Sequence, residues 1–153
     1  MTKLKKILIP TDLSEYARYA LPYAVELART NGAEIHLVHV LDTTWLAPAA
    51  AAEFPGQLSV AIDNSEELAA ETLREMGADI KEVPVHTKTL VGAPHVEIVR
   101  YARQQETDLV VVSTHGRTGL SHALIGSVAE KIVQMAPCPV LTVKHPEHEF
   151  VMP

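Results

Sequence analysis

The chain of 153 residues contains one cysteine, Cys138, so no disulfide can form within it. This excludes a small secreted fold stapled by disulfides and favours a reducing compartment. Cys138 lies between two prolines. We interpret it as a small buried hydrophobic residue rather than a reactive thiol, because nothing around it in the sequence favours a thiolate.

Long hydrophobic runs are also missing. The first apolar run follows three lysines and superficially resembles a signal peptide, but Pro10 and Asp12 cut it short. It is too short for a signal core or a membrane span, so we expect a cytoplasmic protein with no membrane partner. Lys and Arg number 13 against 19 Asp and Glu, and the net charge is −6. No nucleic-acid partner is expected, because duplex binding depends on a basic face.

Several signatures of catalysis and metal binding are absent. The chain has no GxxxxGK[ST] loop, which disfavours a P-loop phosphotransferase, and no Gly-x-Ser-x-Gly elbow of an α/β-hydrolase. Its eight histidines include neither a helical His-x-x-x-His spacing nor cysteine partners. His36 and His39 are three apart on one predicted strand and face opposite sides, while His145 and His148 fall in a polar tail. We therefore predict no metal site formed by the protein alone.

Five short runs rich in Val and Ile are bounded by Gly, Pro, Asp or Asn. Runs that are apolar on both faces are typical of central strands in a parallel sheet. The predicted strands are Lys6–Pro10, Glu34–Leu41, Val83–Thr89, Leu109–Ser113 and Val140–Val143.

Four helical patterns alternate with these strands. They are expected to begin near Ser14, Leu58, Pro94 and Ser127. The first is expected to kink at Pro22 and to end at Gly32, and the second to end at Gly77. The alternation predicts an α/β fold: one doubly wound, five-stranded parallel sheet with helices on both faces, Rossmann-like, over residues 1–143. A polar tail is expected over residues 144–153, and 42–56 is interpreted as a variable connection.

The segments after the first and fourth strands have the composition of a ligand site. In an open α/β sheet, ligands bind beyond the carboxyl ends of the strands. Gly116 and Gly126 let the backbone approach a bulky anion, and the helix near Ser127 adds N–H groups and partial positive charge. Arg117 is the one cationic side chain of this loop, and Asp12 suits hydrogen bonding to a ribose or an adenine amine.

Structural explanations of the same residues remain open at this stage. Residues 127–130 also fit a capping box, which accounts for Ser127 without a ligand. The glycines fit ordinary turns, and Asp12 fits a cap of the first helix. His115 is interpreted as a residue that fixes loop geometry through a hydrogen bond, with general-base catalysis as the alternative.

Six segments follow one another in order: Ile7–Ser14, Leu37–Val40, Asp108–Val112, Thr114–Gly119, Gly126–Ala129 and Pro137–Leu141. This series resembles the universal stress protein family, whose fold is related to the adenine nucleotide α-hydrolase-like folds. The ATP-binding branch of that family carries Gly, two residues, Gly, nine residues, then Gly and Ser or Thr. The chain has Gly116, Gly126 and Ser127 at this spacing, with Ser113 in place of the first glycine.

The resemblance implies a homodimer that binds ATP with Mg²⁺. By position, it assigns adenine and ribose to Pro10, Thr11, Asp12 and the backbone of Val40. It assigns the phosphates to Gly116, Gly126, Ser127 and Val128, with Ser113, His115 and Arg117 in the same loop. It also implies dimerisation through the last strand, Val140, Leu141, Thr142 and Val143.

Three functions are compatible with these features. The first is a nucleotide-binding regulatory protein of the stress response, whose ATP occupancy is sensed by an unidentified protein partner. The second is a slow ATPase in which His115 is the candidate base, although no catalytic residue is assigned. The third is a nucleotide-free dimeric interaction module whose loop is structural.

Overall fold

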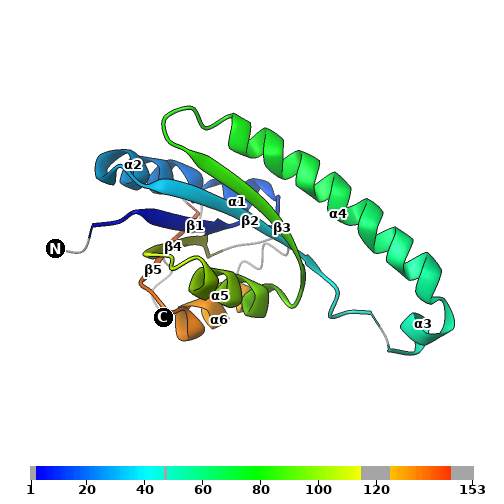
Figure 1. The fold of residues 1–153 in the computed structure, drawn as a ribbon. Helices are drawn as coiled ribbons and strands as arrows, with labels where there is room; N and C mark the ends of the chain where they lie inside the picture. Colours follow the sequence, from blue (N-terminus) through cyan, green and yellow to red (C-terminus); the bar gives the residue numbers. More distant parts are fainter. Residues whose placement is uncertain (1–2, 47, 115–124, 146–153) are drawn as a thin grey trace.

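Five parallel strands form one sheet between two layers of helices in the computed structural model, which describes residues 3–46, 48–114 and 125–145 (Figure 1). The strands are β1 (Lys6–Pro10), β2 (Glu34–Asp42), β3 (Val85–Gly92), β4 (Leu109–Ser113) and β5 (Val140–Val143). Their order across the sheet is β3-β2-β1-β4-β5, and every neighbouring pair is parallel. The predicted doubly wound α/β fold is confirmed.

The strand boundaries agree with the sequence prediction except at β3. Strands β1, β4 and β5 match it residue for residue, and β2 extends one residue further. The predicted bounds of the third strand, Val83–Thr89, are wrong, because β3 begins at Val85 and continues to Gly92. It is longer because it pairs with β2 as far as Asp42, opposite Gly92.

The helices α1 (Glu15–Arg18), α2 (Leu21–Asn31), α3 (Pro48–Glu53), α4 (Pro55–Ala78), α5 (Pro94–Gln104) and α6 (Ser127–Met135) connect the strands. Ser14 is the N-cap of α1, since its side chain accepts a hydrogen bond from the Ala17 N–H. The predicted kink at Pro22 is wrong, because Pro22 lies in the first turn of a separate helix, α2. Backbone N–H groups in the first turn have no partner within the helix, so a proline there costs no hydrogen bond. Helix α2 ends at Gly32, as predicted.

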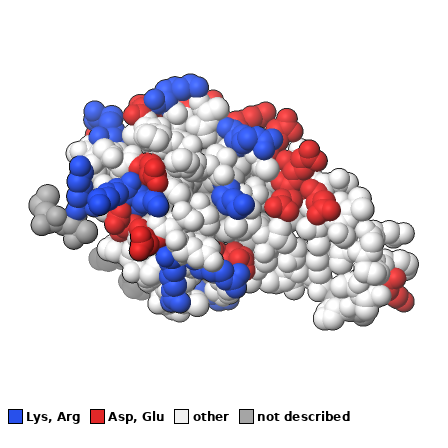
Figure 2. All heavy atoms as spheres, in the orientation of Figure 1, with Lys and Arg blue, Asp and Glu red and all other residues white. Residues whose placement is uncertain are grey.

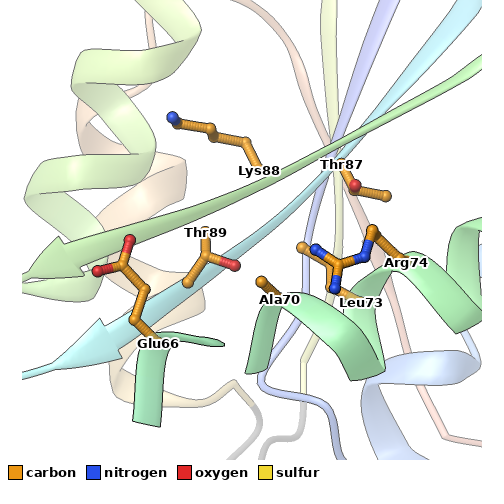
Figure 3. A pocket seen from close by; sticks show the side chains of 7 residues that line it. All are labelled: Glu66, Ala70, Leu73, Arg74, Thr87, Lys88 and Thr89. Atoms are coloured by element: carbon orange, nitrogen blue, oxygen red, sulfur yellow. The ribbon is translucent and has the colours of Figure 1, made fainter. Parts of the chain in front are cut away.

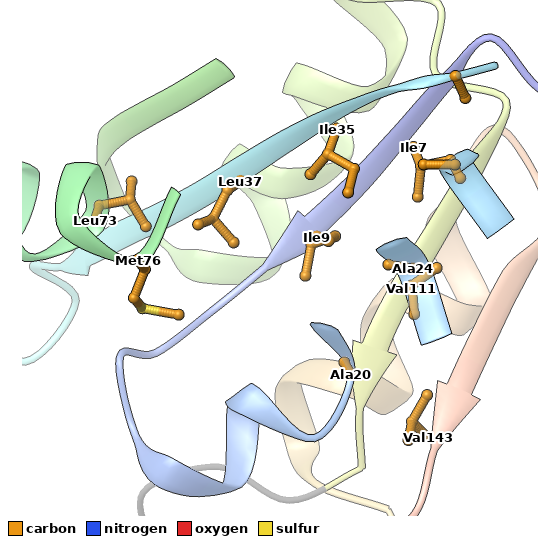
Figure 4. Close-up of a cluster of buried hydrophobic side chains, with 12 residues drawn as sticks. Ile7, Ile9, Ala20, Ala24, Ile35, Leu37, Leu73, Met76, Val111 and Val143 are labelled. Carbon is orange, nitrogen blue, oxygen red and sulfur yellow. The ribbon is translucent and has the colours of Figure 1, made fainter. Parts of the chain in front are cut away.

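Two hydrophobic cores lie on the two faces of the sheet. On one face, Ile7 and Ile9 of β1 pack with side chains of β2, α2 and α4, including Leu73 and Met76 (Figure 4). On the other face, Leu8 packs with residues of β2, β4, α5 and α6. Because β1 is covered on both sides, its sequence is continuously apolar from Ile7 to Pro10 rather than alternating.

Helix α4 is much longer than the sheet is wide, and its first half projects with α3 beyond the body of the molecule (Figure 1). This end is almost without charge on the face shown in Figure 2, and it exposes Phe54 and Val60. Elsewhere on that face, Lys and Arg are interspersed with Asp and Glu. No helix among the described residues is long and apolar enough to cross a membrane.

Candidate functional site

The carboxyl ends of β1 and β4 lie side by side at the point where the strand order reverses. The two strands are paired only over residues 7–8 and 109–110, so their last residues are not joined. Continuing this register places Thr11 level with Ser113. A crevice at such a reversal point is where open α/β sheets bind their ligands.

The turn after β1 is held by its own polar groups. The Thr11 N–H donates to the Val38 carbonyl at 2.8 Å, and Asp12 Oδ1 accepts from the N–H of Ser14 at 3.0 Å and from its hydroxyl at 2.5 Å. Leu13, between them, has φ +66°, and its N–H donates to Thr11 Oγ1 at 3.1 Å. A left-handed conformation costs a non-glycine residue about 1–2 kcal/mol, and strain of this kind clusters at functional sites. The Asp12 carboxylate therefore stabilises the turn in which it lies, through its hydrogen bonds with Ser14.

Strand β2 supports this turn from the side. The buried ring of His39 donates from Nδ1 to the Thr11 carbonyl at 2.9 Å, a positioning contact that the sequence did not reveal. Along a strand, alternate residues direct their backbone groups to the same edge. Val40 therefore directs its N–H and C=O to the same edge as Val38, just beyond the end of β1. Its side chain is buried, so its backbone is the part placed at the crevice.

Gly126 lies against the end of β4. Its N–H donates to the Thr114 carbonyl at 2.6 Å, while the Thr114 N–H donates to the Val143 carbonyl at 3.0 Å. A Cβ added at Gly126 would lie 3.1 Å from the same Thr114 oxygen. Since Gly126 has φ −66°, glycine is needed here for close approach and not for a left-handed conformation.

Ser113 has no backbone strain. It stands where the motif of the resembled family, Gly, two residues, Gly, nine residues and Gly, has its first glycine. Among residues 3–46, 48–114 and 125–145, the non-glycine residues with positive φ are Leu13 and Glu106. Ser113 is a regular strand residue, and it is 8% exposed. The replacement of glycine by serine is therefore compatible with the backbone at this position.

Helix α6 begins directly at this point. Gly126 is its N-cap and Ser127 its first residue, and the N-cap makes no side-chain hydrogen bond to the helix because glycine has no side chain. The capping-box explanation of Ser127 is therefore wrong, because Ser127 stands one position too late to be the cap. Ser127 and Val128 are exposed in the first turn, where N–H groups and partial positive charge favour an anion.

The predicted site residues fall into two groups. Pro10, Thr11, Asp12 and Val40 lie around the ends of β1 and β2, and Ser113, Gly126, Ser127 and Val128 lie at the end of β4 and the start of α6. His115, Gly116 and Arg117 lie outside the described residues.

Two cavities lie on the face of the sheet that α2 and α4 cover. One, of about 200 Å³, is formed by α4 and β3 and is lined by Glu66, Ala70, Leu73, Arg74, Thr87, Lys88 and Thr89 (Figure 3). It is smaller than the roughly 300–1,000 Å³ of common ligand pockets. The other, of about 460 Å³, lies between α2 and the end of α4. Neither is lined by a residue of the predicted nucleotide site.

Comparison with known proteins establishes the family. The model of the universal stress protein family matches residues 3–144. Universal stress protein MJ0531 of Methanocaldococcus jannaschii is 37% identical over 95% of this chain and 85% of its own length. The chain belongs to the universal stress protein family.

Solved structures show the same fold. The structure of MJ0577, also from M. jannaschii, superimposes with a TM-score of 0.77 at 32% identity, covering 95% of this chain and 99% of that one. UspA of Lactobacillus plantarum gives a TM-score of 0.80 at 27% identity, covering 94% and 99%. Two universal stress proteins solved with nucleotides, one with cAMP and one from Archaeoglobus fulgidus with dAMP, share the fold at 21% and 22% identity, with TM-scores of 0.60 and 0.56. Each alignment covers 94% of this chain and at least 98% of the other.

Proposed function

We propose that this chain binds ATP with Mg²⁺ in the crevice between the carboxyl ends of β1 and β4. The observation that carries the proposal is the packing of Gly126 against the Thr114 carbonyl, at a distance that a Cβ would make too short. This packing starts α6 directly at the end of β4 and brings the unpaired N–H groups of the helix to the crevice.

The two sides of the crevice suit the two ends of a nucleotide. The backbone of Val40 offers one donor and one acceptor to the adenine edge, and Asp12 supplies a carboxylate near the ribose. Pro10 and Thr11 form the wall between them. On the other side, Ser127 and Val128 face the phosphates with main-chain N–H groups. Gly126, whose own N–H donates to the Thr114 carbonyl, lets the backbone come close to them.

Ser113, at the end of β4, lies on the phosphate side of the crevice. His115, Gly116 and Arg117 of the loop that follows also contact the phosphates in this arrangement. Mg²⁺ accompanies the triphosphate and neutralises part of its charge, and oxygen ligands of the phosphates and water suit it. The fold accommodates adenine nucleotides in other proteins, because two more distant relatives were solved with cAMP and dAMP.

The cellular role that we propose is regulatory. Occupancy of the crevice changes the contacts of the loop between β4 and α6, and a protein partner senses that change in the cytoplasm. Slow hydrolysis of ATP is the alternative within the same pocket, with His115 as base. Replacement of His115 by Ala separates the two functions, because it stops phosphate release only if His115 activates water.

The proposal includes a homodimer formed through β5. This strand is at one edge of the sheet, and Leu141 and Thr142 are exposed along it. An exposed apolar edge strand favours pairing with another chain unless it is covered. A Leu141→Lys variant is expected to be monomeric by light scattering, whereas an unchanged dimer would place the interface elsewhere.

Calorimetric titration with ATP and with GTP, each with Mg²⁺, tests the nucleotide site. Guanine presents the opposite donor and acceptor pattern to the Val40 backbone, and one mismatched buried hydrogen bond costs about 1–3 kcal/mol. We therefore expect ATP to bind at least about fivefold more tightly than GTP. Equal affinity would contradict adenine recognition by Val40, and binding of neither nucleotide would leave the interaction module as the better function.

A further inference from the structure

A cluster of three potential metal ligands lies at the opposite end of the sheet from the nucleotide crevice. Glu34 begins β2, and His36 follows on the same face, directly opposite His86 of β3 in the register. The ligand atoms of these three residues all lie within 4.8 Å of one another. The pairing of His36 with His86 depends on the register of β3 against β2, which is not visible in the sequence.

The Glu34 carboxylate lies within reach of both histidines. Its Oε1 is 3.0 Å from His36 Nε2, and its Oε2 is 3.4 Å from His86 Nε2. Two ligands of a tetrahedral zinc ion, each at its usual bond length, are about 3.3 Å apart. Both carboxylate–histidine distances are close to this value, and rotation of the side chains would bring the three ligand atoms, which lie within 4.8 Å of one another, around one ion.

His36 is already oriented for metal binding. Its side chain is 7% exposed, and Nδ1 lies 2.8 Å from the hydroxyl of Tyr101 on α5. With Nε2 on a metal, Nδ1 carries the proton and donates to the Tyr101 oxygen. An outer partner of this kind fixes the ring and the tautomer of metal-binding histidines. The Tyr101 hydroxyl oxygen can accept this bond.

The other two ligands are accessible from solvent. His86 is 57% exposed and Glu34 35%, so an ion can reach both side chains. Lys6 Nζ is a competing cation 3.8 Å from Glu34 Oε1, the oxygen that also faces His36. Lys6 also donates to the Gln105 carbonyl at 2.9 Å, a contact that it keeps when an ion takes its place beside the carboxylate.

We propose that Glu34, His36 and His86 bind one Zn²⁺ ion, with the fourth position open to water or to an outside ligand. Two imidazole nitrogens and one carboxylate suit zinc, whereas Mg²⁺ and Ca²⁺ prefer oxygen ligands alone. The site ties the edge strand β3 to β2 and is independent of nucleotide binding. The competing explanation is a proton-bound cluster in which Glu34 simply accepts hydrogen bonds from both histidines.

Zinc titration of the metal-stripped full-length chain, followed by calorimetry and native mass spectrometry, tests the proposal. We expect one Zn²⁺ per chain. Tyr101→Phe removes an outer hydrogen-bond partner and is expected to weaken Zn²⁺ binding by roughly 10- to 100-fold. His86→Ala and Glu34→Gln each remove a ligand and are expected to weaken binding by more than that. His86 and Glu34 are both solvent-accessible, so these variants are expected to fold.

The matched controls are His95→Ala, on α5 outside the cluster, and His148→Ala near the C-terminus. Both are expected to bind Zn²⁺ as the unmodified chain does. The proposal is overturned if the unmodified chain binds no Zn²⁺. It is also overturned if His86→Ala and Glu34→Gln bind it with unchanged affinity and stoichiometry, because the ion then lies elsewhere.

Discussion

Replacing Gly126 by alanine tests whether close backbone packing at the end of β4 creates the phosphate site. The added methyl group would lie 3.1 Å from the Thr114 carbonyl oxygen, where ordinary contacts begin at 3.4 Å. The same oxygen accepts the Gly126 N–H at 2.6 Å, so relieving the clash lengthens that hydrogen bond. The substitution therefore displaces the start of α6 by a few tenths of an ångström.

The size of the effect follows from the cost of overpacking. Inserting a methyl group into a tightly packed position costs about 1–3 kcal/mol. If the displaced N–H groups are those that hold the phosphates, this cost corresponds to a loss of roughly 5- to 150-fold in ATP affinity. The free energy of unfolding is expected to fall by a similar or smaller amount, since alanine lowers the entropy of the unfolded chain.

Gly56→Ala is the matched control. A Cβ at Gly56, in the first turn of α4, has no atom within 4 Å. This variant is expected to bind ATP with unchanged affinity in calorimetric titration and to be as stable as the unmodified chain or slightly more so. If Gly126→Ala were destabilised in urea unfolding but bound ATP with unchanged affinity, the packing of Gly126 would be structural only and the reasoning would be refuted.

Three further predictions concern groups outside the loop. Burial raises the pKa of the Cys138 thiol, so alkylation by iodoacetamide at neutral pH is expected to be slow in the folded chain and fast in denaturant. The lowered pKa of Glu34 stabilises the folded state above the ordinary glutamate pKa of about 4.3, and this contribution is lost as the pH falls through the folded-state value. Urea unfolding between neutral and acidic pH is therefore expected to show a smaller loss of stability for Glu34→Gln; an identical pH profile would contradict this. His39→Ala leaves the Thr11 carbonyl without its buried donor, which is expected to cost about 1–3 kcal/mol and to lower the melting temperature.

Local sequence signals were sufficient to predict most of the fold. The apolar runs at β1, β4 and β5 predicted the strands without error. Strands β1 and β4 lie inside the sheet and are covered on both faces, so they are apolar over most of their length, whereas the edge strand β5 was recognised from its short apolar run alone. Ser14 predicted the start of α1 for the same local reason, since a cap bonds within its own turn.

The errors arose where a residue acts through contacts distant in the sequence. The helix was predicted to end at Gly77, and α4 ends one residue later at Ala78. What the sequence does not show is that this glycine also allows close packing, because a Cβ there would lie 2.8 Å from the Thr87 side chain on β3. The end of β3 depends on its pairing with β2, and the His36–His86 pair depends on the same register. Such contacts are fixed by the packed sheet and leave no local pattern.

The candidate site was predictable in part. The sequence predicts the end of β1, where Pro10, Thr11 and Asp12 lie, and the start of α6, which Gly126 precedes. The placement of these residues at one edge of the sheet then follows from the parallel strands. The support of Thr11 by His39 was missed, because nothing in the order of residues distinguishes a buried histidine that positions a turn from one that fills the core.

Native mass spectrometry of the purified chain with ATP and Mg²⁺ tests whether the crevice holds a nucleotide. We expect a dimer with one ATP in each chain, with affinity in the micromolar range or tighter. A chain that carries no ATP even at millimolar nucleotide would contradict the proposed site. The loop after β4 would then have a structural role, and protein partners would be the function to pursue.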